Sequence, residues 1–293
     1  MSQICLLELG DETRLETFLQ PYVASSMFLL SNLAKGGIVD EGKPYQATYL
    51  GVFEEDRLVS VASHTWQGMI LLQTLVKAPE LLEAMVKQTQ RPVTGIAGPS
   101  FQVKQVCNTF AIHPQLCHYA SDELLFRLQL KSLEALPRVT QRQCQLRLAT
   151  NQDQALVSQW RKEFCLELQG DHLTPKLEEK VAQEVTDLLK QEAIYLLFQK
   201  DIPVAMTLVN ARFSEVVQLG GIYTPPQYRD RGFGRLIVKA TLLAMKDQGV
   251  QEAVLYTGKN NFPAQRIYQA LGFQEIGKYG LLLFSNPLDL SYF

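Results

Sequence analysis

The sequence predicts an α/β protein built from two similar units, and three observations support this prediction. A strand, a glycine-containing loop and a long amphipathic helix follow one another over residues 215–249. A pair of short apolar strands joined by a charged turn occurs at 47–62 and again at 193–206. Tyr49 and Tyr195, which occupy matching places in these pairs, lie about half a chain length apart. Such a repeat indicates that one α/β unit occurs twice.

Each unit is expected to start with a helix, predicted at 11–19 and at 153–164 from the spacing of apolar residues. A third strand follows the strand pair at 69–76 in the first unit and at 215–222 in the second. The apolar stretch 123–133 is expected to close the sheet of the first unit. The other elements predicted in the second unit are a strand from Leu146, a helix that includes 236–244, a strand at 253–257 and a helix after Asn261.

The join between the units is predicted at 137–143, which is polar and begins with a helix-breaking proline. A new strand and the start of a helix follow this stretch directly. The predicted domains are therefore residues 1–138 and residues 144–293.

Composition and charge exclude several classes of function. The chain has 293 residues, of which 46% are hydrophobic and 20% charged, with a net charge of −2, so nucleic acid and anionic membranes are not expected partners. No apolar run is long enough to span a membrane, and a signal peptide is not expected because the first eleven residues lack a basic start followed by an apolar core. The five scattered cysteines favour reduced thiols and a cytoplasmic location. The four histidines lack metal-ligand spacing, so no metal is expected. The oligomeric state cannot be inferred.

A loop rich in glycine and arginine follows the strand at 215–222. Arg229, Arg231, Gly232 and Gly234 lie where the next helix is expected to begin. The start of a helix has free backbone N–H groups and a partial positive charge, which suit a phosphate group. Glycine lets the backbone approach that phosphate, and arginine adds matching charge. We therefore expect an anionic cofactor here; the alternative is an ordinary turn with exposed arginines.

Two motifs indicate which cofactor this is. The spacing fits neither the dinucleotide-binding fingerprint nor a P-loop. The pattern Arg-x-x-Gly-x-Gly at 229–234 resembles the pyrophosphate-binding signature of the GNAT acetyltransferases, which bind acetyl-CoA. The stretch 261–273 resembles the second signature of that family, in which an asparagine, an alanine and a tyrosine lead to Leu-Gly-Phe. The resemblance covers about half of the chain, from residue 146 onward. Together with the internal repeat, it implies two GNAT-like units, each a mixed, mostly antiparallel sheet flanked by helices.

The resemblance also implies which residues bind the cofactor. They are Ile222, Tyr223, Thr224, Arg229, Asp230, Arg231, Gly232, Phe233, Gly234, Arg235, Asn261 and Tyr268. Among them, the backbone N–H of Ile222 is expected to face the thioester carbonyl and to stabilise its developing negative charge. Gly220 and Gly221 are expected to open the sheet where the cofactor enters. The alternative is a bulge without a catalytic role.

Tyr268 matches the tyrosine that members of the family use as general acid toward the sulfur of coenzyme A. A phenol with a pKa near 10 stays protonated at neutral pH and can donate to a forming thiolate. The alternative is a tyrosine that only packs its ring on the sheet. Asn261 is expected either to hydrogen-bond the pantetheine arm or to cap the following helix.

The sequence does not identify a general base. Many members of the family carry a glutamate on the central strand, but the matching position here is Gln218, which cannot accept a proton. Glu167, Asp171 and His172 follow the first helix of the second unit, in a segment that often borders the acceptor in this family. A water relay, or an acceptor that arrives deprotonated, is the alternative.

The first unit departs from the family at the loop. Residues 77–80, Lys-Ala-Pro-Glu, contain no glycine and place a single cation beside a carboxylate. The glycines at 95–98 lie elsewhere in the order of elements and are interpreted as a turn. We therefore expect a degenerate first unit and one coenzyme A per chain.

The function implied is an acetyl-CoA-dependent N-acyltransferase that moves an acetyl group to a primary amine. The acceptor is expected to be a small molecule or a peptide. The alternative is a non-catalytic acyl-CoA-binding sensor or scaffold. The missing strand glutamate favours this alternative, whereas the presence of Tyr268 favours the enzyme.

Overall fold

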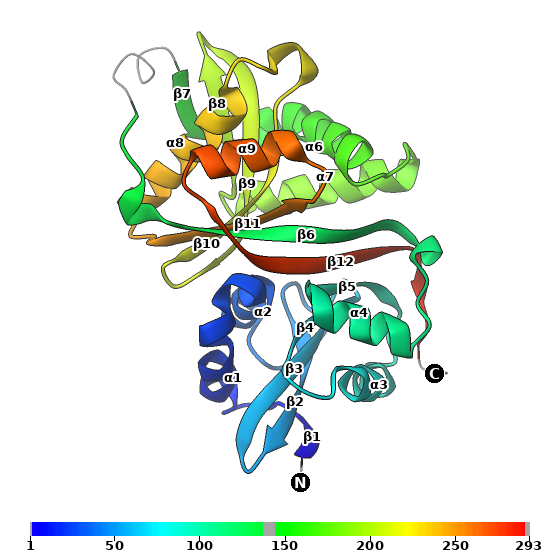
Figure 1. Ribbon diagram of the computed structural model, residues 1–293. Helices are drawn as coiled ribbons and strands as arrows, with labels where there is room; N and C mark the ends of the chain where they lie inside the picture. Colours follow the sequence, from blue (N-terminus) through cyan, green and yellow to red (C-terminus); the bar gives the residue numbers. More distant parts are fainter. Residues whose placement is uncertain (1, 137–143, 291–293) are drawn as a thin grey trace. The chain divides into compact units, whose positions relative to one another are not determined.

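The structure, a computed structural model, describes residues 2–136 and 144–290. Its contacts divide the chain into two compact units (Figure 1). Unit 1 comprises Met1–Leu125 and Ile276–Phe293, and unit 2 comprises Phe126–Glu275. The fold class expected from the sequence is confirmed in each unit, because helices flank a mixed and mostly antiparallel sheet.

Unit 1 contains a sheet in the strand order β1-β2-β3-β4-β5-β12. Neighbouring strands are antiparallel except for β4 and β5, which are parallel. Helices α1 and α2 cover one face, and α3 and α4 cover the other (Figure 1). Leu81, Leu82 and Met85 form the fully buried side of α3, as expected for an amphipathic helix. The elements are β1 (Ser2–Leu6), α1 (Glu12–Leu19), α2 (Val23–Gly36), β2 (Ala47–Glu54), β3 (Arg57–Thr65), β4 (Met69–Thr74), α3 (Ala78–Thr89), β5 (Val93–Pro99), α4 (Ser100–Thr109) and β12 (Gln274–Leu288).

Unit 2 contains a sheet in the order β6-β11-β10-β9-β8-β7, to which β6 contributes its C-terminal end. Only β10 and β11 are parallel among the pairs described between β7 and β11. Helices α6 and α7 pack on one face, where Trp160 and Val181 meet Met206 and Leu208. Helix α8 covers the other face (Figure 1). The elements are β6 (Cys117–Gln129), β7 (Cys144–Leu148), α6 (Gln154–Leu168), α7 (Pro175–Lys190), β8 (Ile194–Gln199), β9 (Ile202–Phe213), β10 (Val216–Tyr223), α8 (Phe233–Asp247), β11 (Glu252–Gly258) and α9 (Phe262–Ala270).

The two halves of the chain have the same order of elements, as the sequence repeat indicated, but they exchange their last strands. The last strand of the second half, β12, pairs with β5 in unit 1. The end of the last strand of the first half, β6, lies beside β11 in unit 2, where the Leu130 N–H donates to the Gln251 carbonyl (2.8 Å).

The expectation that 123–133 closes the first sheet is therefore wrong, because β12 occupies the place next to β5. For the same reason the compact units differ from the continuous ranges 1–138 and 144–293. The expected join at 137–143 lies outside the described residues.

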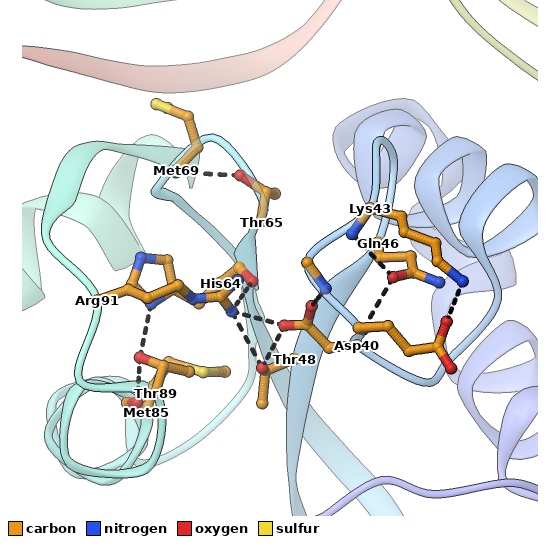
Figure 2. Close-up of polar contacts among 12 residues, drawn as sticks. Asp40, Lys43, Gln46, Thr48, His64, Thr65, Met69, Met85, Thr89 and Arg91 are labelled. Atoms are coloured by element: carbon orange, nitrogen blue, oxygen red, sulfur yellow. Dashed lines mark hydrogen bonds and ion pairs between the residues drawn. The ribbon is translucent and has the colours of Figure 1, made fainter.

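A polar cluster in unit 1 joins four separate segments around Arg91 (Figure 2). Its Nη2 donates to Asp40 Oδ2 (2.6 Å), to Thr48 Oγ1 (3.1 Å) and to the backbone carbonyl of His64 (3.0 Å). The His64 ring is completely buried, and its Nδ1 lies 2.8 Å from Thr89 Oγ1. Burial, and secondly the charge of Arg91, lowers the pKa of His64 to about 4. His64 is therefore neutral at pH 7.

Candidate active site

The candidate site in unit 2 lies where β10 separates from β11. The two strands pair in parallel at Val216–Gln218 opposite Glu252–Val254, and their described register ends there. β10 nevertheless continues to Tyr223. The edge of β10 beyond Gln218 is therefore open on the β11 side. An open strand edge offers N–H and C=O groups that an extended ligand can pair with.

A bulge in β10 lies along this open edge. In the register with β9, Gly220 lies opposite Leu208 and Tyr223 opposite Met206, so one extra residue of β10 falls between them. Gly221 has a φ of +53°, and a Cβ built on it would lie 2.5 Å from the Leu208 side chain. Both its conformation and its surroundings thus require glycine. Ile222, the next residue, stands outside the regular ladder with β9.

The glycine loop, residues 224–234, leads from β10 into the start of α8. Gly232 has a φ of +79° and immediately precedes the helix. The first backbone hydrogen bond of α8 runs from the Leu236 N–H to the Gly232 carbonyl (3.0 Å). The N–H groups of Phe233, Gly234 and Arg235 come before it and have no acceptor within the helix. None of the described atoms lies within 4 Å of a Cβ built on Gly232. The loop thus presents a helix N-terminus that a phosphate can approach.

The arginines of the glycine loop differ in what they contact. Arg229 donates through Nε to the Thr224 carbonyl (3.0 Å) and through Nη2 to Glu167 Oε2 (2.7 Å). The hydrogen bond to Glu167 raises the pKa of Arg229, so this side chain keeps its charge but is already paired. Arg231 donates to Gln199 Oε1 (3.1 Å), and its guanidinium lies over the Phe233 ring.

Arg235 and Asp230 are exposed. Asp230 has a φ of +59°, an uncommon conformation for a residue other than glycine. It therefore helps to form the turn that precedes Gly232.

A buried tyrosine and a glutamate of α6 meet at the end of β10. Tyr223 is 3% exposed and packs against Trp160, with 6.5 Å between the ring centroids. Its hydroxyl donates to Glu163 Oε2 (3.0 Å), and Gln159 donates to the other carboxylate oxygen of Glu163 (2.8 Å). Burial, the hydrogen bond to Glu163 and nearby carboxylate charge raise the pKa of Tyr223 to about 12. Tyr223 therefore stays protonated and acts as a donor.

Helix α9 carries the second predicted motif. Asn261 caps the helix, since its side chain accepts a hydrogen bond from the Ala264 N–H (3.3 Å), which favours the capping interpretation. Tyr268 is 5% exposed, and its ring packs between Phe126 and Phe273, with 5.8 Å between ring centroids in each case. The ring is thus held rigidly. Gly234 lies beside α9, because a Cβ built on it would be 3.0 Å from Ile267 Cδ1.

The structure shows where Gln218 and the three residues considered for the role of general base lie. Gln218 is buried on β10. Glu167 is held in an ion pair with Arg229. Asp171 and His172 lie between α6 and α7. His172 is exposed, and the charge of Asp171 is among the interactions that raise the pKa of Arg161.

Glu163 was not predicted from the sequence. It forms no ion pair with any residue that the structure describes, unlike Glu167 one helical turn away. The signal that could have found it is the spacing of Glu163 and Glu167, which places both on one side of α6.

The corresponding place in unit 1 is closed by unit 1 itself. The Thr74 N–H, at the end of β4, donates to Oε1 of the buried Gln102 (2.8 Å), and the next two N–H groups donate to Ser60 Oγ (3.0 Å each). Helix α3 has a proline in its first turn, which lacks an N–H, and Glu80 adds negative charge there. These features are unfavourable for phosphate binding.

Two further properties concern the described residues as a whole. They contain no group of three or more histidine, cysteine or acidic side chains arranged to hold a metal ion. Within the same ranges, no helix combines the length and apolar character that crossing a membrane requires.

Comparison with known proteins agrees with this geometry. Residues 157–273 match the model of the acetyltransferase (GNAT) family. N-acetyltransferase family 8 member 2 of Rattus norvegicus is 32% identical over 77 residues, which are 26% of this chain and 34% of that protein. Aminoglycoside N(6′)-acetyltransferase type 1 of Salmonella typhimurium is 36% identical over 62 residues, which are 21% of this chain and 43% of that enzyme. The matches thus span between a third and a half of the length of these relatives.

The fold extends the similarity over nearly the whole chain. The solved structure of a tandem GNAT protein from the clavulanic acid biosynthesis pathway superposes with a TM-score of 0.53 at 11% identity, and the match covers 98% of this chain and all of that one. At this identity the likeness concerns the fold alone. The family match and the strand opening followed by a glycine loop both fall in the second half of the chain, where residues 157–273 match the GNAT acetyltransferase family.

Proposed function

We propose that this chain is an acetyl-CoA-dependent N-acyltransferase that transfers an acetyl group to a primary amine. The observation that carries the proposal is the parting of β10 from β11 beyond Gln218, directly ahead of the glycine loop and the start of α8. The open strand edge fits an extended arm with amide groups, and the helix start fits a pyrophosphate.

The residues present fit coenzyme A in a consistent order. The N–H groups of Phe233, Gly234 and Arg235, with the side chain of Arg235, would hold the pyrophosphate. The backbone of 219–224 would pair with the pantetheine arm, and Ile222 N–H would face the thioester carbonyl. When bound, acetyl-CoA supplies an activated acetyl group as a thioester.

Within this site, we propose that Arg229 holds the glycine loop in position and does not itself bind the cofactor. Its bonds to the Thr224 carbonyl and to Glu167 fasten the beginning of the glycine loop to α6. We propose this as its main contribution, because its guanidinium is already paired.

Tyr268 is proposed as the proton donor to the departing sulfur. Because its ring is packed between Phe126 and Phe273, the hydroxyl can be presented in a fixed direction. Asn261 is proposed to act through the start of α9, which it caps.

Glu163 is proposed as the proton acceptor for the amine. It lies at the end of β10, it is fixed by Tyr223 and Gln159, and it has no cationic partner in the described part of the chain. Replacing Glu163 with glutamine keeps the shape of the side chain and removes the base. Its amide oxygen can still accept from one of the two partners, and the contact with the other is kept only if the Tyr223 hydroxyl, or a turned Gln159 amide, accepts from the new N–H group. Glu167→Gln, one turn away, is the matched control that loses an ion pair instead.

The test has two steps. Calorimetry with acetyl-CoA is expected to show one binding site per chain, and a screen of primary amines with detection of released thiol is expected to show turnover. In the next step Glu163→Gln should lower kcat by about a hundredfold or more, whereas Glu167→Gln should weaken acetyl-CoA binding. Binding of acetyl-CoA without turnover of any amine would favour the sensor or scaffold instead.

The acceptor is proposed to be a small-molecule or peptide amine. One relative is by name an aminoglycoside N-acetyltransferase, so an amine acceptor is consistent with the family. A cytoplasmic location is likewise proposed. It is supported by the five cysteines, which are all unpaired and suit a reducing compartment.

A further inference from the structure

The carboxamide of Gln218 is buried without a partner for its nitrogen. The residue is 3% exposed, and Nε2 finds no hydrogen-bond partner among the described residues. A buried donor that lacks an acceptor destabilises the folded protein, so such groups are rare unless something else satisfies them. Gln218 also stands at the last pair between β10 and β11, where the strand edge becomes open.

The pairing of β10 with β9 shows which face Gln218 occupies. Gly220 and Tyr223 lie opposite Leu208 and Met206, whose side chains pack beneath α6 and α7. Side chains alternate along a strand, so Gln218 lies on the same face as Gly220. It therefore faces α6, the helix that carries Glu163, and not α8.

A second carboxamide lies next to it. Gln218 pairs with Ala211 of β9, and Leu219 pairs with Val209. Asn210, which lies between these two residues of β9, therefore has no partner in β10 and forms a bulge. Its side chain lies over Gly220, because a Cβ built on Gly220 would be 2.0 Å from Asn210 Nδ2. A side chain at Gly220 would displace this amide from its present position. Two neutral amide side chains, Gln218 of β10 and Asn210 of β9, therefore line this face of the sheet ahead of Tyr223. On this face β10 itself contributes no cation and no carboxylate.

From these two amides, and from the unpartnered Nε2 of Gln218, we infer that the acceptor is an α-aminoacyl compound, such as an amino-acid amide or a peptide N-terminus. In such a compound a neutral carbonyl oxygen lies two bonds from the carbon that carries the amine. Gln218 Nε2 donates to that oxygen while the amine points along β10 toward Ile222 and Glu163. A simple polyamine offers only N–H donors when charged, so it cannot satisfy Nε2. The inference rests on the proposed function and specifies its acceptor.

The test compares Gln218→Met with a matched control, Gln102→Met in unit 1. Both replace a buried glutamine by an unbranched side chain of similar volume, but Gln102 is satisfied by the Thr74 N–H. In thermal unfolding without ligand, Gln218→Met should unfold at the same or a higher temperature than the wild type. Gln102→Met should unfold at a lower one. A clear loss of stability in Gln218→Met would overturn the inference.

Activity is measured with two acceptors of the same shape, glycinamide and 2-methylallylamine, in which a methylene and a methyl replace the carbonyl oxygen and the amide nitrogen. Gln218→Met should lower kcat/KM about tenfold or more for glycinamide and leave that for 2-methylallylamine nearly unchanged. For each acceptor, kcat/KM of the variant is divided by that of the wild type. The different pKa values of the two amines therefore do not affect the comparison. Equal losses for both acceptors would overturn the inference.

The failure of the proposed function would look different. It would appear as absent acetyl-CoA binding, or as no thiol release with any amine. If acetyl-CoA binds without turnover, ligand-observed NMR with glycinamide and coenzyme A replaces the rate. Binding by wild type that Gln218→Met loses supports the acceptor assignment, and no binding by wild type overturns it.

Discussion

Gly234 offers the sharpest test of the cofactor site, because one substitution there has two separable effects. A valine would add bulk beside the free N–H groups at the start of α8, where a phosphate is proposed to bind. It would also press on α9, since a Cβ at Gly234 would lie 3.0 Å from Ile267 Cδ1. The substitution Ile267→Val removes that Cδ1 atom. The variants Gly234→Val and Gly234→Val/Ile267→Val therefore separate cofactor binding from helix packing.

The expected magnitudes follow from these contacts. Losing about two charge-assisted hydrogen bonds to a phosphate costs about 3 kcal/mol, which is about a hundredfold in Kd for acetyl-CoA. The pressure on Ile267 should lower stability by about 1 kcal/mol in Gly234→Val. Because Ile267 is only half-buried, its own truncation to valine should cost less than about 1 kcal/mol.

Calorimetry and thermal unfolding provide the two readouts. The double variant should regain most of the stability lost in Gly234→Val, and its affinity for acetyl-CoA should stay about a hundredfold low. If the double variant recovers both, Gly234 serves helix packing alone. If neither variant binds acetyl-CoA more weakly than wild type, the phosphate assignment is wrong.

Three further predictions concern other parts of the chain. Calorimetry should give one coenzyme A per chain, since Gln102 and Ser60 occupy the strand-end N–H groups in unit 1; a stoichiometry of two would refute this. Tyr268→Phe should keep the ring packing and lower kcat by about 10² to 10⁴ with little change in acetyl-CoA affinity; a variant with more than about a third of wild-type kcat would remove the tyrosine from the mechanism. The buried His64, whose pKa is lowered from 6.5 to about 4, binds fewer protons in the folded than in the unfolded state between these values. Stability should therefore fall by about 3 kcal/mol as pH drops through this window. Urea unfolding at several pH values should show a smaller loss in His64→Asn, and an unchanged loss would contradict the assignment.

Much of the fold could be predicted because its signals are local. The first helices at α1 and α6 follow from apolar spacing, and the start of α8 follows from Gly232, whose positive φ suits glycine. The position where the sheet opens was also close to the expected one, although the parallel pairing ends at Gln218, two residues before Gly220.

Contacts between distant residues could not be predicted in the same way. The ion pair of Arg229 with Glu167, for example, had no local signal, because Glu167 lies on a helix far earlier in the chain. The exchange of β6 and β12 was missed because both are apolar strands that follow a helix. Either could pair with β5 as far as local pattern shows, and the choice depends on side-chain fit along the strand. At Gly280, for example, a Cβ would lie 2.9 Å from the Val103 side chain of α4.

The place of β12 has a consequence for how the protein is made. One edge of β5 pairs with β4, and the other pairs with β12 through residues 279–283 and Leu288, which a ribosome synthesises after all of unit 2. Unit 2, by contrast, contains the end of β6 and is contiguous in the chain. During synthesis from the N-terminus, β1 to β5 therefore leave the ribosome long before β12 is available to complete their sheet. Until then, one edge of β5 remains unpaired. The half that is translated first is expected to be the half that finishes folding last.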